Sequence, residues 1–120
     1  MKVRQAYVRV YVRDLNTSRP FYEQLLGEAA SAQFTYEAAG LELAVVGPIL
    51  ILAGTDQALA PFRETRATFI VDDVQEFHDH LAGAGCRIIR EMAKVPTGMN
   101  LTVQHPDGTL IEYVQLRSIS

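Results

Sequence analysis

Cysteine is almost absent from this sequence, with one residue, Cys86, in a chain of 120. Cys86 has no second cysteine for an internal disulfide and none of the companions that a zinc cluster requires. No activating motif surrounds it, so we interpret it as a small, half-buried residue at the start of a strand rather than a catalytic thiol. The sequence therefore excludes a disulfide framework and a cysteine-based metal site.

An excess of positive charge and a long apolar run are missing as well. The 11 Lys and Arg residues are scattered and are outnumbered by 14 Asp and Glu, giving a net charge of −3, which does not fit a nucleic-acid-binding surface. The apolar run 41–52 is interrupted by Glu42, Gly47 and Pro48 and is too short to span a bilayer. Residues 1–5 have no signal-peptide pattern. We expect a cytoplasmic protein that binds neither nucleic acid nor membranes.

The clearest pattern in the chain is a strict alternation over residues 7–14. Valines stand at positions 8, 10 and 12, and between them lie Tyr7, Arg9, Tyr11 and Arg13. A period of two predicts a β-strand with different surroundings on its two faces. We expect the valine face to pack under a helix and the other face to line a cavity.

The order of predicted elements occurs twice. A helix that ends at Gly27 follows the first strand, and strands are predicted at 33–37, 41–46 and 49–52. After a surface loop at 55–64, a strand at 66–71 precedes a helix that Asp72 or Asp73 caps, and strands are predicted at 86–93, 99–104 and 109–115. We therefore predict one domain of two βαβββ modules, about 1–56 and 65–117. Hydrophobic residues, at 48% of the chain, suffice for its core.

Three segments, in order, carry a family resemblance: 10–15 leading to 21–27, then 69–74, then 106–112. With the duplicated modules, they resemble the vicinal oxygen chelate superfamily, which includes glyoxalase I, bleomycin-resistance proteins, fosfomycin-resistance enzymes and extradiol dioxygenases. The resemblance implies an α+β fold in which two βαβββ modules form a curled mixed sheet around a cavity, often in a homodimer.

The resemblance also implies where a metal would be held, in the first and last strand of each module. The matching positions in this sequence are Tyr7, Ile51, Arg66 and Glu112. Only Glu112 suits a cation, because Ile51 has no donor atom and the Arg66 guanidinium is itself cationic. We expect no metal site.

The histidines and the common catalytic motifs give no other centre. His78 and His80 are two apart on a predicted helix and so lie on different faces, and His105 precedes Pro106 in a predicted turn. The sequence has no G-x-S-x-G, Walker or G-x-G-x-x-G motif. We expect no cofactor, and Glu112 is the single candidate for a catalytic residue.

The cavity face should instead bind a small organic molecule between apolar walls and a few polar groups. The residues expected to contact it are Tyr7, Arg9, Tyr11, Ile51, Arg66, Thr68, Met99 and Glu112. For Arg66 and Glu112 a structural ion pair is the alternative, and Tyr7 and Tyr11 are equally well explained as core rings.

Three functions follow from this pattern. The first is metal-independent binding of a small molecule by a homodimer of the bleomycin-resistance type, with antibiotic sequestration as one form of it. The second is a lyase, isomerase or dioxygenase of the same superfamily with an atypical site around Glu112, and the third is an interaction module with a collapsed cavity. We expect binding rather than catalysis.

Overall fold

The computed structural model describes residues 1–117. The chain divides into two compact units. The N-terminal unit is Tyr7–Glu64, and the C-terminal unit combines Met1–Ala6 with the chain from Thr65 onward. Strand β1 (Val3–Val12) contributes residues to both. Each unit has the element order predicted from the sequence, a strand, a helix and three strands, which confirms the α+β fold class.

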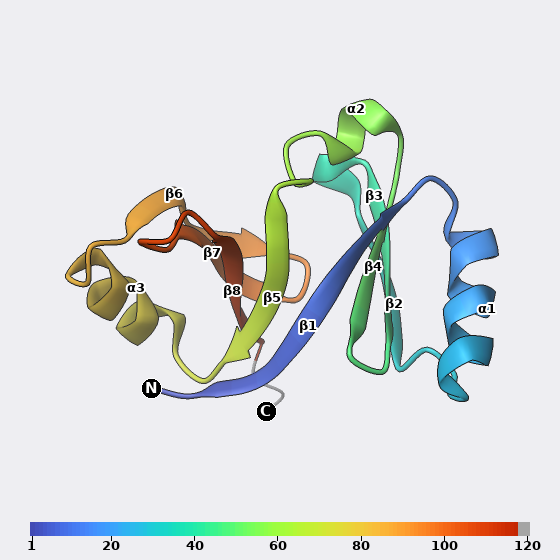
Figure 1. Cartoon of the computed structure of the whole chain (residues 1–120), viewed down its shortest axis with the longest axis horizontal. Helices are drawn as coiled ribbons and strands as arrows, with labels where there is room; N and C mark the ends of the chain where they lie inside the picture. The colour runs from blue at the N-terminus through green and yellow to red at the C-terminus, as the bar shows by residue number, and fades with distance from the viewer. Residues whose placement is uncertain (118–120) are drawn as a thin grey trace. The chain divides into compact units, whose positions relative to one another are not determined.

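In the N-terminal unit, four strands form a mixed sheet in the order β2-β3-β4-β1. Strands β1 and β4 are parallel, whereas β2–β3 and β3–β4 are antiparallel. Figure 1 shows α1 lying along this sheet. The elements after β1 are α1 (Leu15–Leu26), β2 (Ala32–Tyr36), the 3-10 helix η1 (Glu37–Ala39), β3 (Leu41–Val46), β4 (Ile49–Ala53) and α2 (Asp56–Leu59).

Helix α1 begins directly after Asp14. Asp14 caps it by accepting hydrogen bonds from the backbone N–H of Asn16 and the hydroxyl of Thr17. Leu15 is buried and Tyr22 packs against the same cluster, but Phe21 and Leu25 are 60% and 65% exposed. Phe21 and Leu25 lie four positions apart and so share a side of the helix that stays exposed in this chain.

The segment 55–64, predicted to be a surface loop, contains the short helix α2. The Thr55 hydroxyl accepts a hydrogen bond from the N–H of Ala58 at 3.1 Å and so caps this turn. Leu59, only 1% exposed, is packed in a cluster with Leu50 and Leu52 of β4. This part of the prediction was wrong, because a single turn of helix anchored by one leucine has too little periodicity to detect.

In the C-terminal unit the strand order is β5-β8-β7-β6, with β5 and β8 parallel and the other pairs antiparallel. Asp73 caps α3, as predicted, by accepting from the N–H groups of Gln75 and Glu76. The helix packs Val74 and Phe77 onto the sheet. The elements are β5 (Thr65–Val71), α3 (Val74–Ala82), β6 (Arg87–Val95), β7 (Gly98–Gln104) and β8 (Leu110–Leu116).

Across residues 1–117, the helices are all too short or too polar to cross a membrane.

Candidate functional site

The pairing of strands in the C-terminal unit assigns each side chain to one of two faces. Phe69 lies opposite Tyr113 in the β5–β8 ladder, and both belong to the apolar core under α3. Thr68 lies opposite Glu112, and Glu112 lies opposite Thr102 on β7. Because neighbouring residues of a strand point to opposite faces, Thr68, Glu112 and Thr102 lie on the face away from α3.

On this face four polar side chains form what we call the Glu112 cluster, made of Thr68, Asn100, Thr102 and Glu112. The Thr68 hydroxyl donates to Oε1 of Glu112 at 2.9 Å. The Asn100 amide donates to Oε2 at 2.9 Å. Thr68 and Thr102 are 2% and 3% exposed. The carboxylate is thus fixed by a hydrogen bond at each oxygen beside a buried hydroxyl, which positions it as a hydrogen-bond acceptor.

Arg66 is not part of this cluster, contrary to the predicted pairing with Glu112. The β5–β8 register shifts between Thr65 and Ala67, so Arg66 lies in an irregular stretch, and Thr68 is the residue opposite Glu112. Arg66 is exposed, and among residues 1–117 it forms no ion pair with Glu112. Arg66 therefore neither forms the predicted ion pair with Glu112 nor lies opposite it, because the register shift removes Arg66 from the regular ladder.

In the N-terminal unit, Tyr7, Arg9 and Tyr11 lie on the face away from α1, as predicted. The Tyr11 hydroxyl donates to the backbone oxygen of Phe62 at 2.5 Å and accepts from Nη1 of Arg9 at 3.0 Å. Both tyrosine rings pack against the apolar cluster that holds Leu59. This face is therefore largely filled by apolar side chains and by α2. Tyr7 and Tyr11 pack as core rings, which was the alternative to ligand contact.

The expected position of Ile51 was wrong. Ile51 lies opposite Val10 in the parallel β1–β4 ladder, is completely buried, and packs with Leu15 under α1. Leu50, opposite Arg9, occupies the other face. Arg9 and Thr68 lie equally far in sequence before the aspartates that cap α1 and α3, so they correspond between the two modules. Leu50 lies opposite Arg9 as Glu112 lies opposite Thr68, so Leu50 is the counterpart of Glu112 in the first module.

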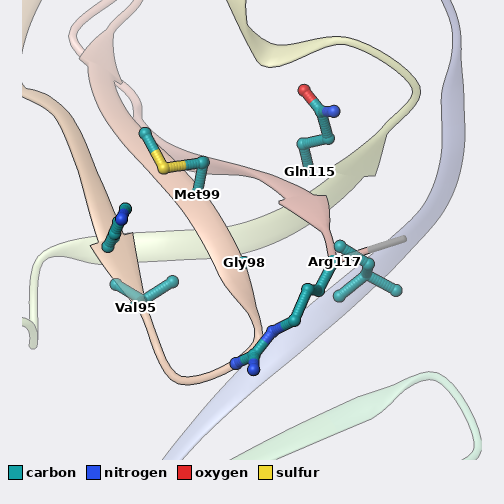
Figure 2. Close-up of a pocket in the computed structure, with 7 residues that line it drawn as sticks. Val95, Gly98, Met99, Gln115 and Arg117 are labelled. Atoms are coloured by element: carbon teal, nitrogen blue, oxygen red, sulfur yellow. The ribbon is translucent and has the colours of Figure 1, made fainter. Parts of the chain in front are cut away.

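Met99 also lies away from the Glu112 cluster. It pairs with Lys94 and Gln115, and it packs against the core under α3. Figure 2 shows Met99 and Gln115 projecting to the same side of the strands, where they line an open cavity of about 450 Å³. Of the expected ligand-contacting residues in the C-terminal unit, Thr68 and Glu112 thus lie in the Glu112 cluster, whereas Met99 lies at this cavity.

Asn100 and Thr102 were missed by the sequence reasoning, although a signal for them is present. Over residues 99–104 the apolar residues Met99, Leu101 and Val103 alternate with Asn100, Thr102 and Gln104. The same period of two that identified the first strand would have placed the second set on one face. Only their distance to Glu112 required the register of the β7–β8 ladder.

The residues around Glu112 do not fit a bound metal ion. Metal sites in proteins draw several ligands from His, Cys, Asp and Glu, and no group of three such side chains is assembled within residues 1–117. Thr68 and Asn100 offer neutral groups that already donate to the carboxylate. Of the four positions that the family resemblance implies for a metal, only Glu112 carries a carboxylate.

Two of the three histidines, His78 and His105, have structural partners. His78 contacts carboxylate oxygens of Asp79 and Glu91, each at 3.1 Å, and the hydrogen bond with Asp79 is the main cause that raises the pKa of His78. Nε2 of His105 lies 2.6 Å from the Tyr113 hydroxyl. Burial raises the pKa of Tyr113 to about 12, so this phenol stays neutral inside the core under α3.

The comparison with family models gives a match over residues 4–113 to the Glyoxalase/Bleomycin resistance protein/Dioxygenase superfamily. The chain belongs to this superfamily. The family resemblance inferred from the sequence is confirmed, and the match extends across both modules.

Solved structures of this superfamily fold are similar to the chain over nearly its full length. An uncharacterized protein from Methanosarcina mazei has 47% identity and a TM-score of 0.93, covering 100% of this chain and 98% of that one. Methylmalonyl-CoA epimerase from Mycobacterium tuberculosis has 22% identity and a TM-score of 0.77, covering 97% and 90%.

A methylmalonyl-CoA epimerase in complex with methylmalonyl-CoA and NH4+ has 19% identity and a TM-score of 0.76, covering 100% and 99%. At these identities the two epimerases show the shared fold alone. The comparison with curated proteins gives no match.

Proposed function

We propose that this chain is a metal-independent small-molecule binding protein of the glyoxalase/bleomycin-resistance type. The observation that carries the proposal is the Glu112 cluster, in which one carboxylate is held at both oxygens by neutral donors. A fixed acceptor flanked by hydroxyl and amide groups is suited to a ligand that presents N–H or O–H donors. Sequestration of such a compound, including an antibiotic, needs no further chemistry.

The geometry of the cluster supports recognition for an energetic reason. Thr68 and Asn100 hold the Glu112 side chain in one position before any ligand arrives, which reduces the conformational entropy lost on binding. Thr102 is buried directly opposite Glu112 in the β7–β8 ladder. A preorganised group of this kind favours selective binding of a compound with matching donors.

A thermal-shift screen of the purified protein tests this proposal. Aromatic and glycopeptide antibiotics, along with amine- and hydroxyl-bearing small molecules, would be added with EDTA and with Zn²⁺, Mn²⁺ or Mg²⁺. We expect compounds that raise the melting temperature equally under all these conditions. Binding that appears only with a metal would contradict metal independence.

The second candidate function is a superfamily enzyme with Glu112 as a general base. It is favoured by the fold shared with methylmalonyl-CoA epimerases, one of which is bound to methylmalonyl-CoA. A base must reach the proton that it removes, and both Glu112 oxygens already accept hydrogen bonds from this chain. That arrangement gives the carboxylate a fixed accepting role and makes catalysis the weaker candidate.

Proton exchange separates the two functions. Methylmalonyl-CoA and other acyl-CoA esters would be incubated with the protein in D₂O, and deuterium at the α-carbon would be followed by NMR. A binding protein gives no incorporation above the buffer rate. Incorporation that is lost in Glu112→Gln but kept in Glu42→Gln, whose site in β3 is exposed, would establish the enzyme instead.

We also propose that the chain works as a homodimer. Phe21 and Leu25 are exposed apolar side chains on α1, and a second copy would remove them from water. Light scattering coupled to size exclusion measures the mass directly. A mass of one chain of 13.3 kDa at micromolar concentration would contradict the dimer.

A further inference from the structure

A hollow lies within the C-terminal unit, where β6 ends, β7 begins and β8 ends. We call it the Met99 cavity. It has a volume of about 450 Å³, within the usual range of small-molecule sites. Its lining residues are Lys94, Val95, Gly98, Met99, Gln115, Leu116 and Arg117.

Two rows of cross-strand neighbours build this cavity. Lys94, Met99 and Gln115 are directly paired across β6, β7 and β8, and they bring an ammonium, a thioether and a carboxamide onto one face. The next row is Val95, Gly98 and Leu116. A side chain at Gly98 would collide with the backbone oxygen of Gln115. The lack of a side chain there lets β7 and β8 approach and leaves the row open.

The polar groups of the cavity are donors. Gln115 Oε1 accepts from the N–H of Val74 at 3.0 Å, which fixes the orientation of the amide and leaves its Nε2 without a partner in residues 1–117. Lys94 is exposed and forms no ion pair within the same residues. The Arg117 guanidinium donates a hydrogen bond to the Pro96 carbonyl, and Figure 2 shows the side chain reaching toward the turn after Val95.

The chemistry of the lining specifies the class of ligand. Two cationic residues and an amide are among the lining residues, no acidic residue within 1–117 lines the hollow, and Val95, Met99 and Leu116 supply apolar surface. Cations and N–H donors recognise carboxylate and phosphate groups, and a thioether adapts to varied apolar shapes. We propose that the Met99 cavity binds a small organic anion with a short apolar body, through Lys94, Gln115 and Arg117.

This site is distinct from the proposed ligand site at Glu112, since Met99 and Gln115 lie on the α3 side of the sheet and Glu112 lies on the other. Binding of an anion in the Met99 cavity therefore does not depend on ligand binding at the Glu112 cluster. A carboxylate and a phosphate ester share the chemistry that the cavity recognises, so the test includes both.

The experiment is a titration followed by two-dimensional NMR of backbone amides, with hexanoate, hexyl phosphate and the neutral hexanol as probes. We expect either anion to shift the amides of residues 94–99 and 115–117 and to leave those of Thr68 and Glu112 unchanged. The anion that binds with the higher affinity shows whether the cavity prefers a carboxylate or a phosphate group. Equal shifts with hexanol, or shifts spread over the surface with no saturation, would overturn the proposal.

A matched pair of variants tests the charge. Lys94→Gln should weaken binding of the preferred anion about five-fold, which corresponds to about 1 kcal/mol for an exposed ion pair. Arg87→Gln removes the same charge from the other end of β6, where Arg87 is exposed, and should leave the affinity unchanged. Equal affinities of the two variants would refute a role for Lys94, whereas the two-dimensional spectra report whether each variant is folded.

Discussion

The two units share an order of elements and differ in what their sheets present on the face away from the helix. In the N-terminal unit this face is apolar, with Leu50, Leu52 and Leu59 packed together. In the C-terminal unit the equivalent face carries Thr68, Glu112 and Thr102. The helix caps are the same in kind, since Asp14 and Asp73 both accept from backbone N–H groups of the first turn.

This difference shows how two modules can keep one order of elements while the other faces of their sheets differ in chemistry. The fold depends on the strand pairing, the aspartate cap and the apolar layer under each helix, which are present in both units. The other face is less constrained, because a carboxylate at Glu112 and a leucine at Leu50 occur at corresponding positions. We expect the N-terminal face to contribute stability and the C-terminal face to contribute recognition.

The largest expected effect tests the apolar face. Leu59→Ala should lower the free energy of unfolding by about 2–5 kcal/mol, because Leu59 is 1% exposed and its removal leaves a cavity in the packed cluster. Urea denaturation followed by circular dichroism measures the change. Gln57→Ala in the same short helix is the matched control, because Gln57 is exposed, and should cost less than about 0.5 kcal/mol. Equal losses would show that α2 does not close this face.

The buried phenol of Tyr113 gives the next largest expected effect on stability. Tyr113 is 3% exposed, and burial raises its pKa to about 12, whereas the unfolded chain ionises near 10. The unfolded state therefore releases this proton first as pH rises. The stability from Tyr113 is complete below pH 10 and falls by about 2–3 kcal/mol between pH 10 and 12.

Urea denaturation across that pH range measures the slope, and Tyr113→Phe is the control. The variant lacks the phenol, so its stability should fall less steeply above pH 10. If both proteins have the same slope, Tyr113 is not the group responsible.

The Glu112 cluster predicts a smaller change in stability. Glu112→Gln keeps one oxygen, replaces the other by an NH2 group and removes the charge, so the two charge-assisted hydrogen bonds from Thr68 and Asn100 are not both retained. We expect a loss of about 1–3 kcal/mol. Glu42→Gln, at an exposed position of β3, should change the unfolding free energy by less than about 0.5 kcal/mol. A Glu112→Gln protein as stable as Glu42→Gln would show that the two hydrogen bonds contribute little.

The helix caps should behave alike in the two units. Asp14→Ala and Asp73→Ala each remove the side chain that satisfies N–H groups at the helix start, and each should cost about 1 kcal/mol. Thermal unfolding of both variants measures the two losses side by side. A loss at one cap and none at the other would mean that the modules do not depend on this feature equally.

The sequence was sufficient for the elements that repeat a strong pattern. The alternation at 7–14, the aspartates before both helices and the duplicated order of strands predicted the α+β fold and its family. Thr68 and Glu112 were placed on the correct face because their strands are regular from Thr68 onward.

The errors have two physical causes. A period of two gives the two faces of one strand but not the pairing between strands, so Ile51 was placed on the face that Leu50 occupies. A register shift cannot be read from side-chain pattern, so Arg66 was set opposite Glu112. The turn of helix at α2 was too short to give a periodic signal.

The most direct test of recognition by the Glu112 cluster is calorimetric titration of the strongest compound from the thermal-shift screen. Wild-type protein, Glu112→Gln and Glu42→Gln would be compared after EDTA treatment. We predict that wild type and Glu42→Gln bind with the same affinity and that Glu112→Gln binds at least about ten-fold more weakly, as for loss of a charged hydrogen bond of about 1.5 kcal/mol. Unchanged affinity in Glu112→Gln, or binding restored only by added metal, would contradict a metal-independent site at Glu112.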